Sequence, residues 1–437
     1  MRAWLKTHRH AAGIRHALEW TQGAYSLVRR LAARDDRPAL DGGWPVRLIG
    51  MPPPRPFTRP ERSALRRAAR AQSTSFFDGE AVRTFEARLA DRFGCRHALA
   101  VSSGTAALHT ALMAARVGPD DEVIVPAMTY VATAMAVMQQ GAVPRFVDAD
   151  PGTWNIDPER IEEAISPRTR AIIPVHIAGV PCDMEAIGAI ADRHDLSVIE
   201  DAAHAHGSTW RGRALGTVGH LGCFSFGSPK SITTGEGGAV LTDDSELFAR
   251  ARIAMNLGET APEGGSPMEH AFFNPQTRLD YTMVGWNYRM STLQAALGIG
   301  QLDRFDRIRS VRARNGAFLH DRLGALDGLA VQRVCDDASP CYYTFPFLLE
   351  EDCPLDRALL LQGLAREKVD VRLWSNLPLA AYEVFGRDGE FPVAQRLCEN
   401  SVGLRVDPAV GSAELADMVT AIRRLLEWGR GREPVRA

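Results

Sequence analysis

A lysine and an aspartate near the middle of the chain are the residues whose types and spacing best fit chemistry. Asp201 ends the apolar run VIED, and Lys230 follows it by 29 positions in the turn-rich segment FSFGSPKSITTGEGG. An aspartate just past a buried strand lies where open α/β sheets bind their ligands. A lysine in such a loop can act as a nucleophilic amine, but on this pattern alone it is more often a solvated surface charge. The spacing leaves both interpretations open.

The segments around this pair alternate in a way that predicts a parallel sheet. Short apolar runs have the length and composition of strands buried on both faces: HALAVSS, DEVIVPA, RAIIPVHIAG, LSVIEDAA and GCFSFGS. Helical patterns separate them at VRTFEARLADRFG, at TAALHTALMAARVG up to Gly118, and from Asp183 to His194. This rhythm predicts an α/β fold with a mostly parallel sheet. A further helix is expected from Ser291 to Leu302, with Gln294 completing a capping box.

Three parts follow one another along the chain. Residues 1–58 form an N-terminal extension, in which residues 1–34 have helical spacing and a basic character, and five prolines between Met51 and Pro60 predict a linker. The basic helix is compatible with packing on the body of the protein, with disorder and with binding to a membrane surface or partner. Residues 59–305 form the large domain. Residues 306–437 are expected to form a smaller α+β domain from IRSVRARNGAFLHDRLGAL, YYTFPFLL and AELADMVTAIRRLLEWG.

Composition narrows the class of protein. Lys and Arg total 51 against 53 Asp and Glu, so no basic excess indicates a nucleic-acid partner. The seven cysteines show no zinc-like spacing, so we expect reduced thiols and no metal site. Neither an apolar run of about eighteen residues nor a secretory signal occurs. A cytoplasmic protein acting on small molecules is therefore expected.

Blocks of sequence between Glu80 and Leu302 carry a family resemblance. They occur in the order AVSSGTAALHTAL, VIVPAMTYVATA, VDADPGTWNIDPERIEEAI, PVHIAG, VIEDAAHAHG, FSFGSPKSITTGEGGAVLTDD and GWNYRMSTLQAALG. Together they resemble the DegT/DnrJ/EryC/StrS sugar aminotransferases, which use pyridoxal phosphate and have the aspartate aminotransferase fold, fold type I. The resemblance implies a large domain with a mostly parallel sheet and a smaller C-terminal domain.

The resemblance assigns the two reactive groups. Lys230 would form the Schiff base with the cofactor aldehyde, which requires a neutral amine with a lowered pKa. Asp201 would pair with the pyridinium nitrogen and keep the ring able to accept electrons. Some relatives have histidine in place of this lysine and remove a hydroxyl group, so Lys230 favours transamination.

The resemblance also assigns the phosphate contacts. Gly104 and Thr105 would open a helix whose free N–H groups and positive dipole end favour an anion, although Ser103 to Thr105 also fit ordinary helix capping. Ser225 would add a hydroxyl donor. Asn287 would reach the phosphate from a neighbouring chain, which implies a homodimer with shared active sites.

Two further residues would contact the cofactor ring. Tyr130 lies where the family has a stacked aromatic residue, and His204 would donate a hydrogen bond to the phenolic oxygen in place of the commoner glutamine. His176 is expected to be structural or to act behind the site.

The substrate stays open at this level. The segment PALDGGWPVR resembles the subgroup of scyllo-inosose aminotransferases and aminohydroxybenzoate synthases, so the acceptor is either a nucleotide-linked keto-sugar or a cyclitol ketone, with glutamate or glutamine as donor. Arg289, Arg372 and Arg405 are candidates for binding a donor carboxylate or an acceptor phosphate. A dehydrating or aromatising lyase with the same cofactor and a non-catalytic regulatory relative are the alternatives.

Overall fold

The structure is a computed structural model that describes residues 37–47, 49–54, 56–70, 80–260, 280–372, 377–387 and 389–431. The basic helix expected at residues 1–34 lies outside the described residues. Within these ranges no helix is long and apolar enough to cross a membrane. Over the same residues no cluster of His, Cys, Asp and Glu could hold a metal ion. All seven cysteines are free.

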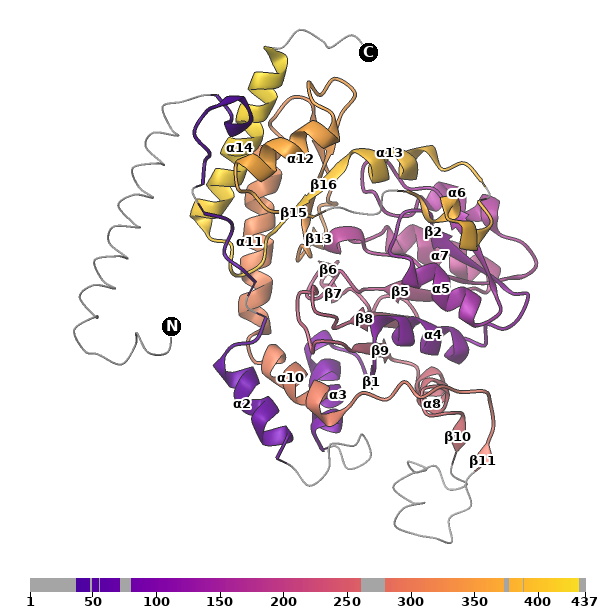
Figure 1. The fold of residues 1–437 in the computed structure, drawn as a ribbon. Coiled ribbons are helices and arrows are strands. Elements are labelled where there is room, and N and C mark those ends of the chain that lie inside the picture. The colour runs from indigo at the N-terminus through magenta and orange to yellow at the C-terminus, as the bar shows by residue number, and fades with distance from the viewer. Residues whose placement is uncertain are drawn as a thin grey trace, which may run out of the picture.

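A seven-stranded sheet forms the centre of the molecule (Figure 1). Its order is β1-β9-β8-β5-β4-β2-β3. Strands β8, β5, β4, β2 and β3 run parallel to one another, whereas β9 is antiparallel to both β1 and β8. The strands are β1 (His97–Val101), β2 (Glu122–Pro126), β3 (Val143–Val147), β4 (Thr169–Ile172), β5 (Ser197–Asp201), β8 (Leu221–Ser225) and β9 (Gly238–Thr242). The predicted mostly parallel α/β sheet is confirmed.

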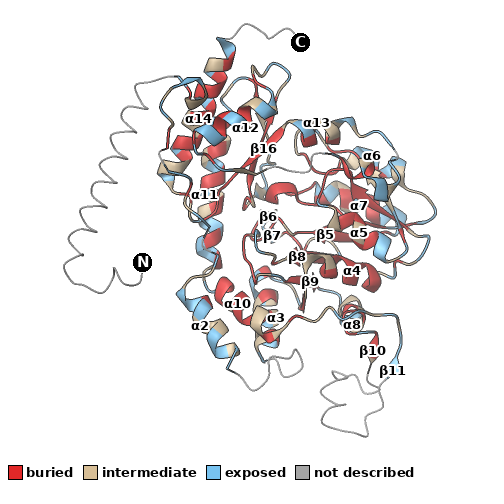
Figure 2. Ribbon diagram, in the orientation of Figure 1, coloured by how far each residue is buried: buried red, intermediate tan, exposed pale blue. Residues whose placement is uncertain are grey.

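Helices cover both faces of this sheet. Successive residues of a strand point to opposite faces, so a strand that is apolar throughout needs packing partners on both faces. On β2, Val123 and Val125 pack into one apolar cluster, and Ile124 between them packs into another. The covering helices are α3 (Glu80–Phe93), α4 (Gly104–Ala114), α5 (Ala132–Gln139), α6 (Pro158–Ala164), α7 (Met184–His194), α8 (Ser245–Ala254) and α10 (Thr292–Leu302). Figure 2 shows the result as buried residues along the strands and on the inner sides of the helices. Continuous apolar strands are stable only with such double coverage.

Polar caps set the start of several helices. Ser291 and Gln294 form the predicted capping box of α10. Asp183 caps α7 by accepting a hydrogen bond from the amide of Ala186. The end of α4 differs from the prediction, because the helix stops at Ala114 instead of continuing to Gly118. Arg116, with φ of 62°, turns the chain before that glycine is reached.

A second, smaller sheet lies in the C-terminal part of the chain (Figure 1). Its order is β12-β14-β16-β15, with β12 (Leu329–Val331), β14 (Phe345–Leu349), β15 (Val371–Arg372) and β16 (Ser401–Leu404). The helices α11 (Phe305–Leu323), α12 (Arg357–Arg366) and α14 (Ser412–Arg430) contribute to the same apolar cluster as this sheet. Helix α13 (Pro392–Asn400) packs beside it. Helix α11, strand β14 and helix α14 correspond to the predicted amphipathic helix, strand and last helix of this part of the chain.

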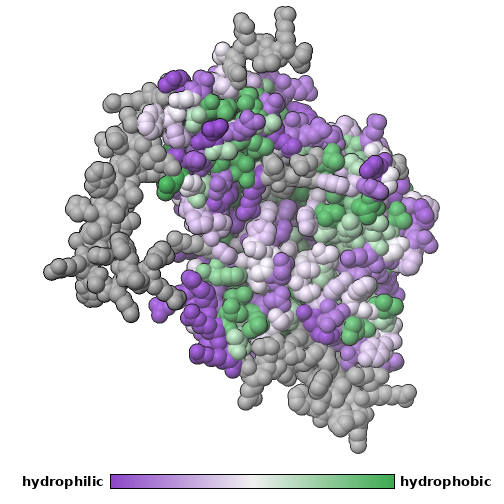
Figure 3. All heavy atoms as spheres, viewed as in Figure 1, coloured by the Kyte–Doolittle hydropathy of each residue, from purple (hydrophilic) through white to green (hydrophobic). Residues whose placement is uncertain are grey.

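The stretch before the large sheet packs on the C-terminal elements. The buried guanidinium of Arg47 lies 2.7 Å from Asp417 and 3.4 Å from Glu414, both on α14. Residues 51–54 and 56–58 have no regular structure, as the prolines predict, and α2 (Arg59–Ala68) begins directly after them. Figure 3 shows hydrophilic side chains along the outer side of this arginine-rich helix.

Candidate active site

The carboxyl ends of β5 and β8 open into a cavity of about 890 Å³. Parallel strands place their carboxyl ends at one edge of a sheet, and that edge is where ligands bind in this class of fold. Most of the predicted site residues line this cavity: Gly104, Thr105, Tyr130, Asp201, His204, Ser225 and Lys230. Asn287 is exposed and does not line it.

Asp201 ends β5 and is 5% exposed. Its Oδ2 accepts a hydrogen bond of 2.9 Å from the hydroxyl of Thr133, and its Oδ1 accepts one of 3.1 Å from the amide of Ala203. The hydroxyls of Thr129 and Thr133 lie 3.2 Å apart and extend this chain of contacts. Burial raises the pKa of Asp201 despite these hydrogen bonds. A buried carboxylate in this state is stabilised by a cationic partner.

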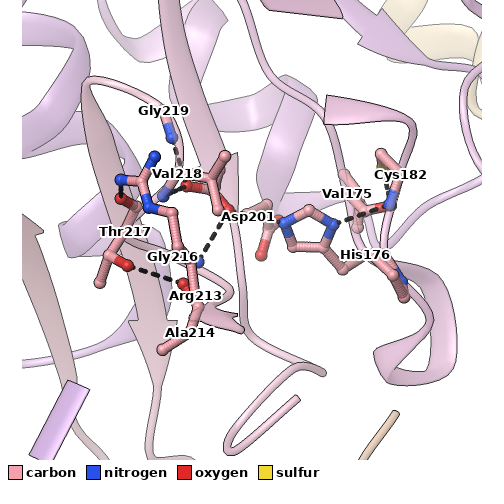
Figure 4. Close-up of polar contacts among 12 residues, drawn as sticks. Val175, His176, Cys182, Asp201, Arg213, Ala214, Gly216, Thr217, Val218 and Gly219 are labelled. Carbon is pink, nitrogen blue, oxygen red and sulfur yellow. Dashed lines mark hydrogen bonds and ion pairs between the residues drawn. The ribbon is translucent and has the colours of Figure 1, made fainter. Parts of the chain in front are cut away.

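Glu200, next to Asp201 in the sequence, and His176 are both fully buried and form hydrogen bonds with the surrounding backbone. Figure 4 shows His176 and the loop at residues 216–219 on the two sides of this region. The amide of Cys182 donates to Nδ1 of His176, so Nε2 of His176 carries the proton that it donates to Glu200 over 2.9 Å. Glu200 also accepts hydrogen bonds from three amides of the loop at residues 216–219. Burial acts to raise the pKa of Glu200, but these donors outweigh it and the pKa is lowered. His176 therefore has the expected structural position behind the site.

Lys230 lies in the loop after β8, with its amine inside the cavity wall. Burial lowers the pKa of this lysine to about 8, with Asp201 acting to raise it and Arg372 to lower it further. A lysine near this value supplies an appreciable fraction of neutral amine at neutral pH. The lowered pKa is a property that a nucleophilic amine requires, and the sequence pattern alone did not indicate it.

The ring of Tyr343 is a part of the site that the sequence did not indicate. It stacks on the imidazole of His204, with ring centroids 4.5 Å apart and planes at 5°. Nζ of Lys230 lies 4.8 Å from the Tyr343 centroid, and the Arg372 guanidinium lies 5.4 Å from it. Tyr343 precedes a buried strand, where an aromatic residue is typical of a core, so no local signal distinguished it. Burial, together with the charges of Lys230 and other nearby groups, holds the pKa of His204 well below its usual value.

The start of α4 forms the opposite end of the cavity. Ser103 caps the helix by accepting a hydrogen bond from the amide of Ala106 over 3.0 Å. A Cβ on Gly104 would lie 2.6 Å from Cβ of Ser225, so only glycine allows the helix to approach this strand so closely. Free N–H groups of the first helical turn and the Ser225 hydroxyl thus share one small region.

These features fit pyridoxal phosphate. The N-terminus of α4 suits an anion, the buried carboxylate of Asp201 suits a pyridinium nitrogen, and the lysine of lowered pKa suits an aldehyde. Tyr130, which is 69% exposed, lies at the mouth of the cavity.

The three candidate arginines, Arg289, Arg372 and Arg405, have different contacts in the structure. Arg405 is 6% exposed and forms ion pairs with Asp407 and Asp370, away from the cavity-lining residues. Arg289 donates to Asn256 over 2.8 Å. The guanidinium of Arg372 lies 5.4 Å from the centroid of the Tyr343 ring, which lines the cavity.

Comparison with known proteins identifies the family. The model of the DegT/DnrJ/EryC1/StrS aminotransferase family matches residues 59–423. The chain belongs to this family. The prediction of a pyridoxal-phosphate-dependent aminotransferase with fold type I architecture is thereby confirmed.

Individual relatives agree with this assignment. GDP-perosamine synthase of Caulobacter vibrioides is 44% identical over 248 residues, which are 57% of this chain and 63% of that protein, so the match spans less than two thirds of it. A putative L-glutamine:3-amino-2,3-dideoxy-scyllo-inosose aminotransferase of Streptoalloteichus tenebrarius is 40% identical over 66% of this chain and 67% of its own length. The crystal structure of an aminotransferase from Psychrobacter cryohalolentis has 31% identity and a TM-score of 0.81, covering 87% of this chain and all of that one.

Proposed function

We propose that this protein transfers an amino group from glutamate or glutamine to a nucleotide-linked keto-sugar or a cyclitol ketone, with Lys230 as the cofactor-binding lysine. The observation that carries the proposal is the shared cavity, in which the lysine of lowered pKa faces the same space as the buried Asp201. The names of the relatives support the two acceptor classes, since one makes an amino sugar and the other acts on an inosose.

When bound, pyridoxal phosphate supplies an aldehyde for the amino group and a conjugated ring that takes up electrons from the substrate carbon. Lys230, as a neutral amine, would hold the cofactor through its aldehyde, and the same amine would be able to accept or donate a proton at the substrate carbon. Asp201 would pair with the pyridine nitrogen and favour its protonated form, and Thr133 and Ala203 hold the carboxylate in place. The apolar wall around Asp201 excludes water, which strengthens this pairing.

The remaining residues bind and orient. Gly104, Thr105 and Ser225 would donate hydrogen bonds to the phosphate, Tyr130 would stack on the ring, and His204 would donate to the phenolic oxygen; all five line the cavity. The stacking of His204 on Tyr343 favours one orientation of the imidazole.

Two chains complete each site in this proposal, with Asn287 reaching the phosphate of its neighbour in a cytoplasmic homodimer. The exposure of Asn287 and its position outside the cavity lining of its own chain support this arrangement. The exposed Tyr281, Val284 and Trp286 beside it provide apolar surface for a two-fold contact. We also propose that the boundary between the large and small domains lies at residue 305, after the end of α10 and at the start of α11.

Incubation of the purified protein with glutamate or glutamine tests the reaction. An aminotransferase converts the cofactor to its amine form, seen in the absorbance, and releases one equivalent of the oxo-acid. A dehydrating lyase or a regulatory relative releases none, and that outcome would refute the proposal. The amine form produced in this way is then incubated with a nucleotide-linked keto-sugar or with scyllo-inosose in separate reactions. The acceptor that becomes aminated identifies the acceptor class.

Reduction with borohydride tests the lysine. The wild-type protein should lose its yellow colour and carry the cofactor on a peptide containing Lys230, whereas Lys230→Ala should carry no label. A label on another lysine would overturn the assignment of the site.

A further inference from the structure

Tyr343 belongs to the C-terminal part of the chain, directly before β14, yet its ring lies against two groups of the large domain. Nζ of Lys230 lies 4.8 Å from the ring centroid, and His204 stacks on the ring at 4.5 Å. Both partners follow strands of the central sheet. The ring is therefore the point at which the C-terminal elements contact the reactive amine.

The backbone on both sides of this ring is anchored. The amide of Tyr343 donates to the carbonyl of Ala178 over 2.9 Å, and the carbonyl of Tyr343 accepts from Nη1 of the buried Arg312 over 2.9 Å. The adjacent Tyr342 packs in the apolar core of the C-terminal part. Movement of the ring away from Lys230 therefore requires either loss of the stack on His204 or displacement of this anchored backbone.

An ammonium group near an aromatic ring is attracted by the electrons of the ring, and a neutral amine is not. This contact therefore favours the protonated form of Lys230. We propose that Tyr343 is a positioning residue for amino transfer, which holds the ammonium form of Lys230 beside the cavity and tunes its basicity through a cation–π contact.

The charged and titratable groups that face Lys230 set the background for this effect. Asp201 at the end of β5 favours the ammonium form, and Arg372 on β15 disfavours it. Burial holds the pKa of His206 at about 3 and that of His204 well below its usual value, so both imidazoles are neutral when Lys230 titrates. Glu236 also lines the cavity. The ring of Tyr343, 4.8 Å from Nζ of Lys230, adds a contact that distinguishes the ammonium from the amine without carrying a charge.

The inference rests on the proposed function, because it requires Lys230 to be the amine that binds the cofactor and moves the proton. During transfer this amine alternates between a neutral and a protonated state. A ring that stabilises the protonated state keeps the released lysine near the substrate carbon, and it does so without a negative charge that would trap the proton.

Two apolar replacements of Tyr343 test whether its aromatic ring causes the effect on the basicity of Lys230. Tyr343→Phe keeps the ring and loses the hydroxyl, whereas Tyr343→Leu loses the ring but leaves an apolar side chain. The apo-protein of each is mixed with pyridoxal phosphate, and the rate of cofactor capture is followed by absorbance from pH 6 to 10. Capture requires the neutral amine, so the rate rises with pH to a midpoint at about 8 in the wild type.

The Leu variant should shift this midpoint down by about 0.4 to 1.5 pH units, the range expected for loss of a cation–π contact, while the Phe variant keeps the wild-type midpoint. An unchanged or raised midpoint in the Leu variant, or equal shifts in both variants, would overturn the inference. Borohydride labelling of the wild type is run in parallel. If the label is absent from Lys230, the proposed function itself fails; if Lys230 is labelled and the midpoints coincide, only the role of Tyr343 fails. Thermal denaturation confirms that each variant is folded.

Discussion

Replacing Gly104 by alanine tests the geometry of the phosphate site most directly. The new Cβ would lie 2.6 Å from Cβ and 3.0 Å from Oγ of Ser225. An ordinary contact is 3.4–4 Å, so the start of α4 and the end of β8 must separate by about 1 Å. Rotation of the serine side chain moves Oγ but leaves Cβ in place, so it does not relieve the closest contact. The strand cannot simply retreat, since Ser225 is paired with Gly238 on β9.

The expected loss follows from the hydrogen bonds involved. A hydrogen bond to a charged group contributes about 1.5–3 kcal/mol, so removing one from the phosphate should raise the dissociation constant of pyridoxal phosphate by about 10- to 100-fold. Alanine is a good helix former, so the helix itself should persist. Titration of the apo-protein with the cofactor, followed by absorbance, measures the effect.

Two further variants isolate the cause. In Gly118→Ala, a control just beyond the same helix, the nearest atom to the new Cβ is Asp121 Oδ2 at 3.9 Å, so cofactor affinity should match the wild type. Ser225→Gly removes the atoms that clash most severely, so Gly104→Ala should weaken binding much less in that background than in the wild type. Wild-type affinity in Gly104→Ala, or an equal loss in both backgrounds, would show that the close approach of α4 to Ser225 does not form the phosphate site.

Other perturbations address the carboxylate, the dimer and the helices. Asp201→Asn should lower the half-reaction with the amino donor by about 100- to 1,000-fold, measured by stopped-flow absorbance, and near-normal rates would remove it from the pyridinium role. Thr133→Val should raise the pKa of Asp201 by removing a hydrogen bond to its ionised form, so the same half-reaction should lose rate at a higher pH on acidification; an identical pH profile would argue against this contact. Inactive Lys230→Ala mixed with an inactive Asn287 variant should regain activity if sites are shared, because a mixed dimer has one site with both defects and one with neither; demonstrated subunit exchange without activity would contradict the trans arrangement. Gly188→Ala on α7 should stabilise the fold by about 0.5–1 kcal/mol in urea unfolding, since nothing lies within 4 Å of the new Cβ, and a loss of stability would count against the helix geometry there.

The local sequence pattern was sufficient to predict the strands and helices that position the site. The apolar runs ending in Asp201 and Ser225 predicted strands buried on both faces, and the double coverage of the sheet explains why those runs are continuous. The capping pair Ser291 and Gln294 predicted the start of α10 because cap chemistry acts within one helical turn. The predicted end of α4 at Gly118 was wrong. Arg116, whose backbone is in the left-handed region, turns the chain before that glycine is reached.

Contacts between distant segments could not be predicted in the same way. Nothing in the neighbourhood of Tyr343 marks it, because its role arises when a residue of the C-terminal part meets His204 and Lys230, more than 110 positions away. Thr133 meets Asp201 across 68 positions, and in the sequence it is an ordinary helix residue. The lowered pKa of Lys230 depends on burial and on the distance to charges of other elements.

Residue types and their order along the chain were therefore enough for the fold class and the family, because these depend on short-range periodicity and on motifs that are contiguous in sequence. The roles of Lys230 and Asp201 remain predictions from the same motifs. The environment of those groups belongs to the tertiary structure. Burial and electrostatics are properties of the space around an atom, and that space is filled by side chains from strands and loops that the sequence separates. For this protein the amine of Lys230 is the clearest case: its place in the sequence is one loop, while its pKa depends on burial and on the charges of Asp201 and Arg372, which folding brings near it.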